Sequence, residues 1–240
     1  MRNDPPASND APQRHAVVTG SSAGIGRAIA EFLLQAGWRV TGLDRAAPTL
    51  VSEHFRAITV DLGINAEAER AAAQLMDADA LVHAAGVLRV GRIGALDPAA
   101  GDLMWRLHVG AASILCNTIL PAMVRRHDGR VVFVGSRVAQ GMPGRGQYAA
   151  TKAALIALSR SWAAEVAAQG VTVNVVSPAA TATGMLNDPA RSASSAQLPP
   201  IGRLIEPMEI AQLVSYLLSP AAAAITGQDI SICGGASLQR

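Results

Sequence analysis

Short apolar runs alternate with longer stretches of helical periodicity along most of the chain. Each apolar run ends at or beside a glycine or a polar residue, which is typical of buried strands. Alternating strands and helices predict an α/β fold, in which a doubly wound parallel sheet of about seven strands has helices on both faces. The expected strands are 15–20, 39–44, 55–60, 79–83, 130–136, 171–176 and 226–232, and the expected helices are 27–36, 65–76, 102–126, 148–168 and 208–218.

Three segments interrupt this alternation. About ten residues, including Pro48, separate the second strand from the third, so the crossover helix is expected to be short or missing. Residues 179–207 are rich in Ser, Pro and Ala, and we expect a mobile lid at 184–206. Residues 1–14 have the composition of a disordered lead-in and lack the apolar core of a signal peptide. Residues 15–240 are therefore expected to form a single domain.

Composition narrows the class of protein. Half of the residues are hydrophobic but 3% are aromatic, so the core is expected to consist mainly of Ala, Val, Leu and Ile. The net charge is +2 and the basic residues are scattered, which argues against a nucleic-acid partner. Cys116 and Cys233 lack metal-ligand spacing, so we expect no metal site. No apolar run looks long enough to span a bilayer, and a cytoplasmic protein without a membrane partner is the simplest interpretation.

A glycine-rich turn follows the first strand and opens the first helix. It reads Gly20-Ser-Ser-Ala-Gly-Ile-Gly26. Gly20 suits the tight turn, Gly24 lets the backbone approach a diphosphate, and Gly26 allows close packing of helix on strand. The helix N-terminus offers N–H groups to an anion. A dinucleotide site is favoured over a plain turn, because the glycines stand between a strand and a helix.

Polar and small residues follow several of the expected strands. Parallel sheets bind ligands at the carboxyl ends of their strands, so these residues should meet at one edge. Asp44 would bind the adenosine ribose and repel a 2′-phosphate, which favours NAD over NADP, whereas Arg45 could accept that phosphate. The residues expected at this edge are Gly20, Asp44, Asp61, Gly86 and Ser136.

Lys152 is the only lysine in the chain, and Tyr148 lies four residues before it. On a helix these side chains share a face. Lowering the pKa of a phenol from ~10 to ~7 takes about 4 kcal/mol. A cation about 4 Å away at an effective dielectric near 20 supplies roughly that free energy, although desolvation of the phenolate opposes it. The pair is a candidate general acid/base, and a helix-surface pair is the alternative.

The chain resembles the short-chain dehydrogenase/reductase family over about residues 14–238. The motifs that carry the resemblance are Thr19-Gly-Ser-Ser-Ala-Gly-Ile-Gly26, Ala84-Ala-Gly86, Ser136 and Tyr148-Ala-Ala-Thr-Lys152, in the family's order. The resemblance implies a Rossmann-like homotetramer that transfers hydride between NAD(P) and an alcohol/ketone pair. Tyr148 would be the general acid/base, Ser136 would hold the substrate oxygen, and Lys152 would bind the nicotinamide ribose and acidify Tyr148. The implied cofactor contacts are Gly20, Ser22, Gly24, Ile25, Gly26, Asp44, Arg45, Asp61, Leu62, His83, Ala84, Gly86, Tyr148, Lys152, Pro178, Thr181 and Thr183.

Three positions depart from the family pattern. His108 stands where the family has an asparagine that bends its helix and holds a relay water. The histidine could relay protons as a catalytic residue, block the water, or be buried and structural. His83-Ala84 replaces the usual Asn-Asn pair, and Pro178-Ala179 replaces Pro-Gly.

Within the family, residues 81–89, the short link after Asp44 and the C-terminal residues 228–237 are most similar to the 2,3-dihydro-2,3-dihydroxybenzoate dehydrogenase branch. A carboxylate-bearing cyclic alcohol is therefore a candidate substrate. Arg89, Arg137 and Arg145 could present a guanidinium to its carboxylate, or they could be ordinary exposed arginines. The alternative function is a catalytically impaired nucleotide-sensing or scaffold protein of the same fold.

Overall fold

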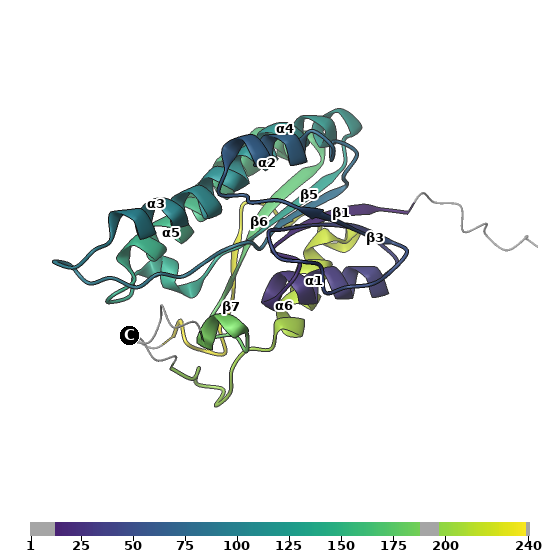
Figure 1. Cartoon of the computed structure of the whole chain (residues 1–240). Coiled ribbons are helices and arrows are strands. Elements are labelled where there is room, and N and C mark those ends of the chain that lie inside the picture. Colours follow the sequence, from purple (N-terminus) through teal and green to yellow (C-terminus); the bar gives the residue numbers. More distant parts are fainter. Residues whose placement is uncertain (1–12, 188–196, 239–240) are drawn as a thin grey trace, which may run out of the picture.

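Seven parallel strands pair in the order β3-β2-β1-β4-β5-β6-β7 in this computed structural model, which describes residues 13–187 and 197–238 (Figure 1). The strand order reverses between β1 and β4, which is where sheets of this kind open a crevice for a ligand. The doubly wound parallel sheet expected from the sequence is confirmed. The strands are β1 His15–Thr19, β2 Arg39–Asp44, β3 Phe55–Thr59, β4 Ala80–His83, β5 Gly129–Val134, β6 Val171–Pro178 and β7 Asp229–Ile232.

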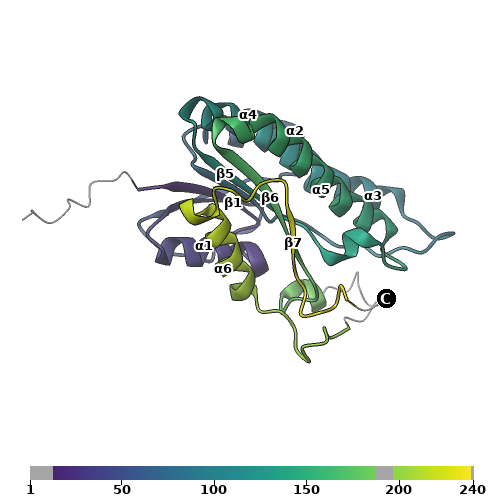
Figure 2. The same cartoon turned by 180° about the vertical axis from the view of Figure 1, so that it is seen from behind.

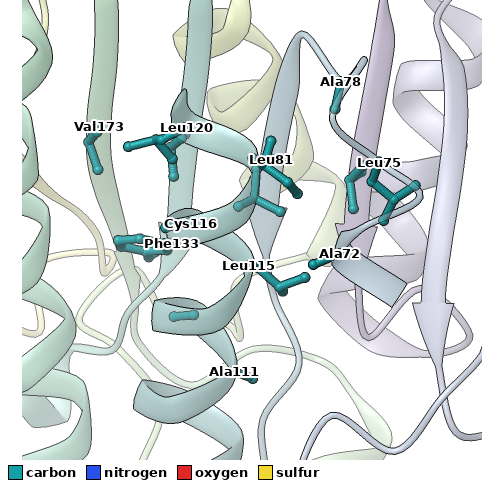
Figure 3. Packing of buried hydrophobic residues seen from close by; sticks show 14 of the residues in the cluster. Ala72, Leu75, Ala78, Leu81, Ala111, Leu115, Cys116, Leu120, Phe133 and Val173 are labelled. Carbon is teal, nitrogen blue, oxygen red and sulfur yellow. The ribbon is translucent and has the colours of Figure 1, made fainter. Parts of the chain in front are cut away.

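Helices cover both faces of the sheet. Helices α2, α4 and α5 lie on one face, and α1 and α6 lie on the other (Figures 1 and 2). Side chains alternate along β1, so Val17 faces the first group of helices and Val18 faces the second. Figure 3 shows Leu81 of the sheet packed among buried residues that include Leu115 of α4. The helices are α1 Gly24–Gln35, α2 Asn65–Ala72, α3 Pro98–Trp105, α4 Ala111–Arg126, α5 Gly146–Val166 and α6 Pro207–Leu218.

The connection from β2 to β3 contains no helix, as its length and Pro48 predict. These two strands are nevertheless parallel neighbours, with Val40 opposite Phe55 and Asp44 opposite Thr59. β3 is the last strand of the sheet on this side, and several of its residues are exposed. The short link therefore leaves the end of β2, where Asp44 stands, uncovered by a helix.

The long helical stretch before β5 differs from its expected form. It begins at Pro98 rather than Asp102, because the Asp97 carboxylate caps it by accepting a hydrogen bond of 2.9 Å from the Ala99 N–H, and Pro98 suits the first turn. A π turn, Arg106–Gly110, then separates α3 from α4. The interpretation that no segment is long enough to span a membrane is wrong by length and composition, since the stretch Pro98–Arg126 meets that criterion. In this fold 56% of its most apolar 18-residue segment is buried, as in a core helix.

The two segments expected to be irregular are described in part. Residues 1–12 lie outside the described ranges, but Gln13 and Arg14 are bound to the domain. The Gln13 side chain donates to the Gly37 carbonyl, and the Arg14 guanidinium donates to the Leu218 carbonyl and lies over Trp38. Of the expected lid, residues 188–196 also lie outside the described ranges. A short 3-10 helix, Gly184–Asn187, precedes them, and a bridge between Thr181 and Ile205 ties the ends of this segment together.

Candidate active site

A cavity of about 870 Å³ opens at the carboxyl ends of the strands. All the residues expected at this edge line it, namely Gly20, Asp44, Asp61, Gly86 and Ser136. The convergence inferred from separate strand assignments is therefore confirmed. Tyr148 and Lys152 of α5 line the same cavity.

The glycine turn has the conformation that a diphosphate site requires. Gly20 and Gly24 have φ angles of +68° and +53°, which are strained for residues with a side chain. A Cβ added to Gly26 would overlap the Gly20 carbonyl oxygen, so α1 can pack this close to β1 only with glycine there. α1 begins at Gly24 without a side-chain cap, so its first N–H groups face the cavity edge unsatisfied by side chains. The turn thus offers N–H donors and the positive end of a helix dipole to an anion.

Asp44 is fixed at the end of β2 by two backbone donors. Its Oδ2 accepts from the Ser22 N–H and its Oδ1 accepts from the Ala46 N–H, both at 2.9 Å. The Ser22 hydroxyl donates to the Ala46 carbonyl at 3.2 Å. Ser22 therefore holds the Asp44 carboxylate in place. The resemblance implied that Ser22 contacts the cofactor, but Ser22 does not line the cavity. Arg45 lies beside Asp44 at the cavity rim.

The remaining implied cofactor contacts border the cavity, with one exception. His83 is buried and absent from the lining, so its side chain is not placed to touch a cofactor. Thr181 is held by a bond from its hydroxyl to the Ala179 carbonyl, 3.0 Å long. The contacts that line the cavity besides those already described are Ile25, Leu62, Ala84, Pro178, Thr181 and Thr183.

Ser136, Tyr148 and Lys152 come from two elements that meet at the cavity floor. Ser136 follows β5 and caps the 3-10 helix Arg137–Gln140, where its hydroxyl oxygen accepts from the Val138 N–H at 3.2 Å. The Lys152 ammonium donates to the Val134 carbonyl at 2.8 Å and lies 5.8 Å from the centre of the Tyr148 ring. All three side chains are at least nine-tenths buried. A hydroxyl, a phenol and an ammonium thus border the same cavity.

Burial dominates the electrostatics of Lys152. Removing the ammonium from water lowers its pKa from 10.5 to about 8. The side chain is still protonated at neutral pH, but its free energy in the folded protein is raised. A neighbouring phenolate or another anion in the cavity would relieve that penalty.

His108 sits in the π turn and is fully buried. The Val87 N–H donates to its Nε2 at 3.0 Å, so Nε2 is the acceptor and Nδ1 carries the proton. Nδ1 donates to the Thr151 hydroxyl at 2.8 Å, and that hydroxyl donates onward to the Tyr148 carbonyl. Burial, followed by the charge of Lys152, lowers the pKa of His108 well below 6.5. Among the alternatives considered from the sequence, this geometry matches a neutral, structural histidine.

Sequence reasoning missed two hydroxyls that organise the site. Thr19 accepts hydrogen bonds from the Ala84 and Ala85 N–H groups at 3.0 and 2.9 Å, and so ties the glycine turn to the Gly86 motif. Thr151 links His108 to the Tyr148 backbone. Their positions in the sequence could have identified them, because Thr19 directly precedes Gly20 and Thr151 directly precedes Lys152.

Comparisons with known proteins agree with this geometry. The family described as Enoyl-(Acyl carrier protein) reductase matches residues 20–237. The chain is 35% identical to the 3-oxoacyl-acyl-carrier-protein reductase FabG of Vibrio cholerae and 36% identical to that of Escherichia coli strain K12, in each case over 92% of this chain and 96% of the relative. A solved structure described as a short chain dehydrogenase/reductase family protein is 34% identical, with a TM-score of 0.87, over 94% of this chain and 97% of the other.

A second solved structure is an actinorhodin polyketide ketoreductase with NADPH, which is 26% identical with a TM-score of 0.84 over 94% of this chain and 97% of the other. None of the relatives given above is a dihydrodihydroxybenzoate dehydrogenase, so that branch stays a prediction. The family match covers most of the chain, and the motifs that carry it line one cavity. The chain belongs to the short-chain dehydrogenase/reductase family, whose members are oxidoreductases that transfer a hydride between a nicotinamide cofactor and an alcohol/ketone pair.

Proposed function

We propose that the protein is an NAD-dependent dehydrogenase that interconverts a secondary alcohol and a ketone on a small substrate bearing a carboxylate. The observation that carries the proposal is the meeting of Ser136, Tyr148 and Lys152 with the glycine turn and Asp44 in one cavity. Turnover of a panel of secondary alcohols, followed by NADH fluorescence, tests it. NADH binding without turnover of any panel member would instead support the nucleotide-sensing alternative.

The cavity residues fit a nicotinamide dinucleotide. The volume of about 870 Å³ lies within the range of about 300–1,000 Å³ that is usual for ligand pockets. The turn at Gly20 and Gly24 would hold the diphosphate together with Thr183, which lies against Gly24. Asp44 would hold the adenosine ribose, and Thr181 would meet the nicotinamide carboxamide. The adenosine end would rest on Asp61 and Leu62, whose loop is fixed by a 2.8 Å bond from the Gly63 N–H to the Asp61 carboxylate.

The chemistry divides among three side chains. When bound, the nicotinamide supplies or accepts the hydride. Tyr148 gives a proton to the carbonyl oxygen during reduction, or takes it from the alcohol during oxidation. Ser136 donates a hydrogen bond to the same oxygen. Lys152 places a buried positive charge on the Tyr148 side of the cavity, which favours the phenolate that oxidation needs.

Cofactor preference is expected to depend on Asp44. We expect kcat/KM for NAD to exceed that for NADP by at least about tenfold, since a like charge 4 Å away at an effective dielectric near 20 costs about 4 kcal/mol. In Asp44→Asn this ratio should fall at least about tenfold, because the repulsion is removed while the amide can still accept one backbone bond. Steady-state kinetics with both cofactors measures the ratio.

Glu53→Gln is the matched control for that variant. It removes the same charge from a carboxylate that is 87% exposed outside the cavity, so the ratio should not change. A native enzyme that prefers NADP would overturn the NAD assignment and assign the 2′-phosphate to Arg45, which lines the rim.

The carboxylate on the substrate is proposed from the arginines. Arg89, Arg137 and Arg145 all line the cavity that Ser136 and Tyr148 border. Guanidinium groups bind carboxylates through strong, often bidentate charge-assisted hydrogen bonds. Arg137 is anchored by a 3.3 Å bond to the Ala236 carbonyl at the same wall. A ring-borne carboxylate, as the dihydrodihydroxybenzoate resemblance suggests, is therefore the first substrate to test.

Arg137→Ala is expected to raise KM for acidic alcohols at least about tenfold, the effect of losing a charged hydrogen bond of about 1.5–3 kcal/mol. KM for neutral alcohols of similar shape should stay within about twofold. Arg160→Ala, an exposed arginine on α5, is the control and should change neither. If the native enzyme has equal kcat/KM for matched acidic and neutral alcohols, the proposal that the substrate bears a carboxylate is refuted.

A second candidate is reduction of a 3-oxoacyl thioester. It is favoured by the 35–36% identity to two proteins named 3-oxoacyl-acyl-carrier-protein reductase. A 3-oxoacyl thioester with NADPH in the same panel separates the two candidates. The homotetramer and the cytoplasmic location also stay predictions, and light scattering of the purified protein tests the former.

A further inference from the structure

His83 closes β4 and is 1% exposed. Its ring meets that of Phe133 edge to face, with the centroids 6.4 Å apart, and it does not line the cavity. In register, His83 lies beside Thr19 on the neighbouring strand, so both side chains point toward the helices that pack on this face. His83 is therefore a polar group inside the protein, directly behind the cofactor side of the site.

The hydrogen bonds of Thr19 define the state of this ring. The Thr19 oxygen already accepts from the Ala84 and Ala85 N–H groups. Its own proton is then directed to His83 Nδ1, 3.0 Å away. Nδ1 is the acceptor, and Nε2 carries the proton of the neutral ring.

The backbone that influences the His83 ring belongs to the π turn. Nε2 is buried without a hydrogen-bond partner among the described residues, while the backbone groups of Leu107 and His108 act on the ring and raise its pKa against the larger effect of burial. A π turn widens the helix and tilts its carbonyls away from the regular ladder. An unpaired buried donor is costly, so a donor beside this turn favours the conformations that bring a carbonyl within reach of it.

From the π turn the contacts continue to the catalytic helix. His108 donates to Thr151, and Thr151 donates to the carbonyl of Tyr148. The rings of His108 and Tyr148 also meet edge to face, with centroids 5.6 Å apart. A small shift of the π turn would therefore move the backbone and the ring of Tyr148 together.

We propose that His83 is a positioning residue that holds the π turn against the glycine turn. Through His108 and Thr151, it would set the position of Tyr148. The proposal rests on the function proposed above only for the role of Tyr148. His83 bonds to Thr19 at the base of the glycine turn, and its ring is influenced by the backbone of the turn that carries His108, so this side chain stands between the glycine turn and the π turn.

The charges around the ring are consistent with this neutral role. The charged group that acts on both histidines is Lys152 of α5, and its ammonium disfavours a second positive charge. Burial and then Lys152 lower the pKa of His83 to about 3. The ring thus keeps one donor and one acceptor over the pH range in which the enzyme would be assayed.

The test compares two buried histidines on neighbouring strands. His83→Phe keeps an aromatic ring beside Phe133 but loses both nitrogens. It should lower kcat roughly tenfold to a hundredfold, the usual effect of a displaced catalytic group, while the Kd for NADH changes less than about threefold. His83→Asn retains an amide donor and acceptor and should recover most of kcat. His15→Phe is the control, because His15 is 2% exposed and bonds to Asp77 and Thr41 away from the cavity.

His15→Phe is expected to lower the thermal midpoint but leave kcat within about twofold. If His83→Phe lowers only the midpoint, or weakens NADH binding as much as it lowers kcat, the positioning role is refuted. Should His83→Phe fail to fold, nitrogen NMR of the native protein decides. It should show neutral His83 protonated at Nε2 and neutral His108 protonated at Nδ1, and the opposite tautomer at either ring refutes the proposal. These tautomers can be measured without a substrate. Absence of turnover in the native protein would therefore contradict the proposed function but not the positioning role of His83.

Discussion

Turnover is expected to fall at least about a thousandfold in Tyr148→Phe, while the Kd for NADH stays within about twofold. The loss has one physical cause, because the substitution removes the proton-carrying hydroxyl and leaves the ring. The contacts of the ring with His108 and Lys152, at 5.6 and 5.8 Å, do not need that hydroxyl. The glycine turn and Asp44, which would hold the cofactor, come from other elements.

Two measurements check this expectation. Single-turnover kinetics on the best substrate of the panel gives the loss in the chemical step, and NADH fluorescence gives the binding constant. The chain has two tyrosines, so Tyr216→Phe is a matched control. Tyr216 lies on α6 and is 47% exposed, and its substitution should leave turnover within about twofold. If Tyr148→Phe retains turnover, Tyr148 is not the general acid/base.

The sheet and its functional edge could be predicted because they depend on local sequence signals. Each apolar run marked a strand, and the residue after it marked the carboxyl end. Parallel pairing then forced Gly20, Asp44 and Ser136 to one edge, where they line the cavity. The shared face of Tyr148 and Lys152 followed from helical spacing, and their catalytic roles followed from the family resemblance.

The hydrophobic pattern did not predict the π turn, although the family resemblance placed a bend at the position of His108. The helical periodicity runs through Trp105 and Ala111, and no glycine, proline or cap marks an inserted residue before Gly110. The insertion is fixed by tertiary contacts of His108, which accepts from Val87 and donates to Thr151. Those partners are distant in the sequence, so a local pattern holds no trace of them.

His83 was assigned to the cofactor because it stands at a position of the family's Asn-Asn-Ala-Gly motif. The resemblance carried over a cofactor contact without testing where this side chain points. Strand alternation gives the opposite result, because His83 lies beside Thr19 in register and both face the helices. The register with β1 was the signal that could have placed it.

Lys152→Met is expected to lower turnover at least about a hundredfold and, at the same time, to make the cofactor-free protein more stable. Lys152 is 5% exposed, and burial lowers its pKa to about 8 from 10.5. The lower pKa corresponds to about 3 kcal/mol of unfavourable free energy at neutral pH. Methionine has a similar length and no charge, so it removes the penalty.

The sign of the pH dependence follows from proton binding. Between pH 8 and 10.5 the unfolded chain holds the lysine proton and the folded protein does not, so native stability rises with pH across this window. Below pH 8 both states are protonated and the full penalty applies. The Lys152→Met variant lacks this group, so its stability should exceed that of the native protein most at pH 7 and the difference should shrink toward pH 10.

Thermal unfolding of the cofactor-free proteins at pH 7 and at pH 10 measures both effects. The gain is reduced by loss of the 2.8 Å bond to the Val134 carbonyl, so a rise of a few degrees in the midpoint is expected at pH 7. Lys152→Arg is the control, because it keeps the charge and should be no more stable than the native protein. A Lys152→Met variant less stable than the native protein at pH 7 would contradict the assignment. Lys152→Met is thus expected to raise the stability of the protein and to lower its turnover. The buried charge of Lys152 therefore serves catalysis and destabilises the fold.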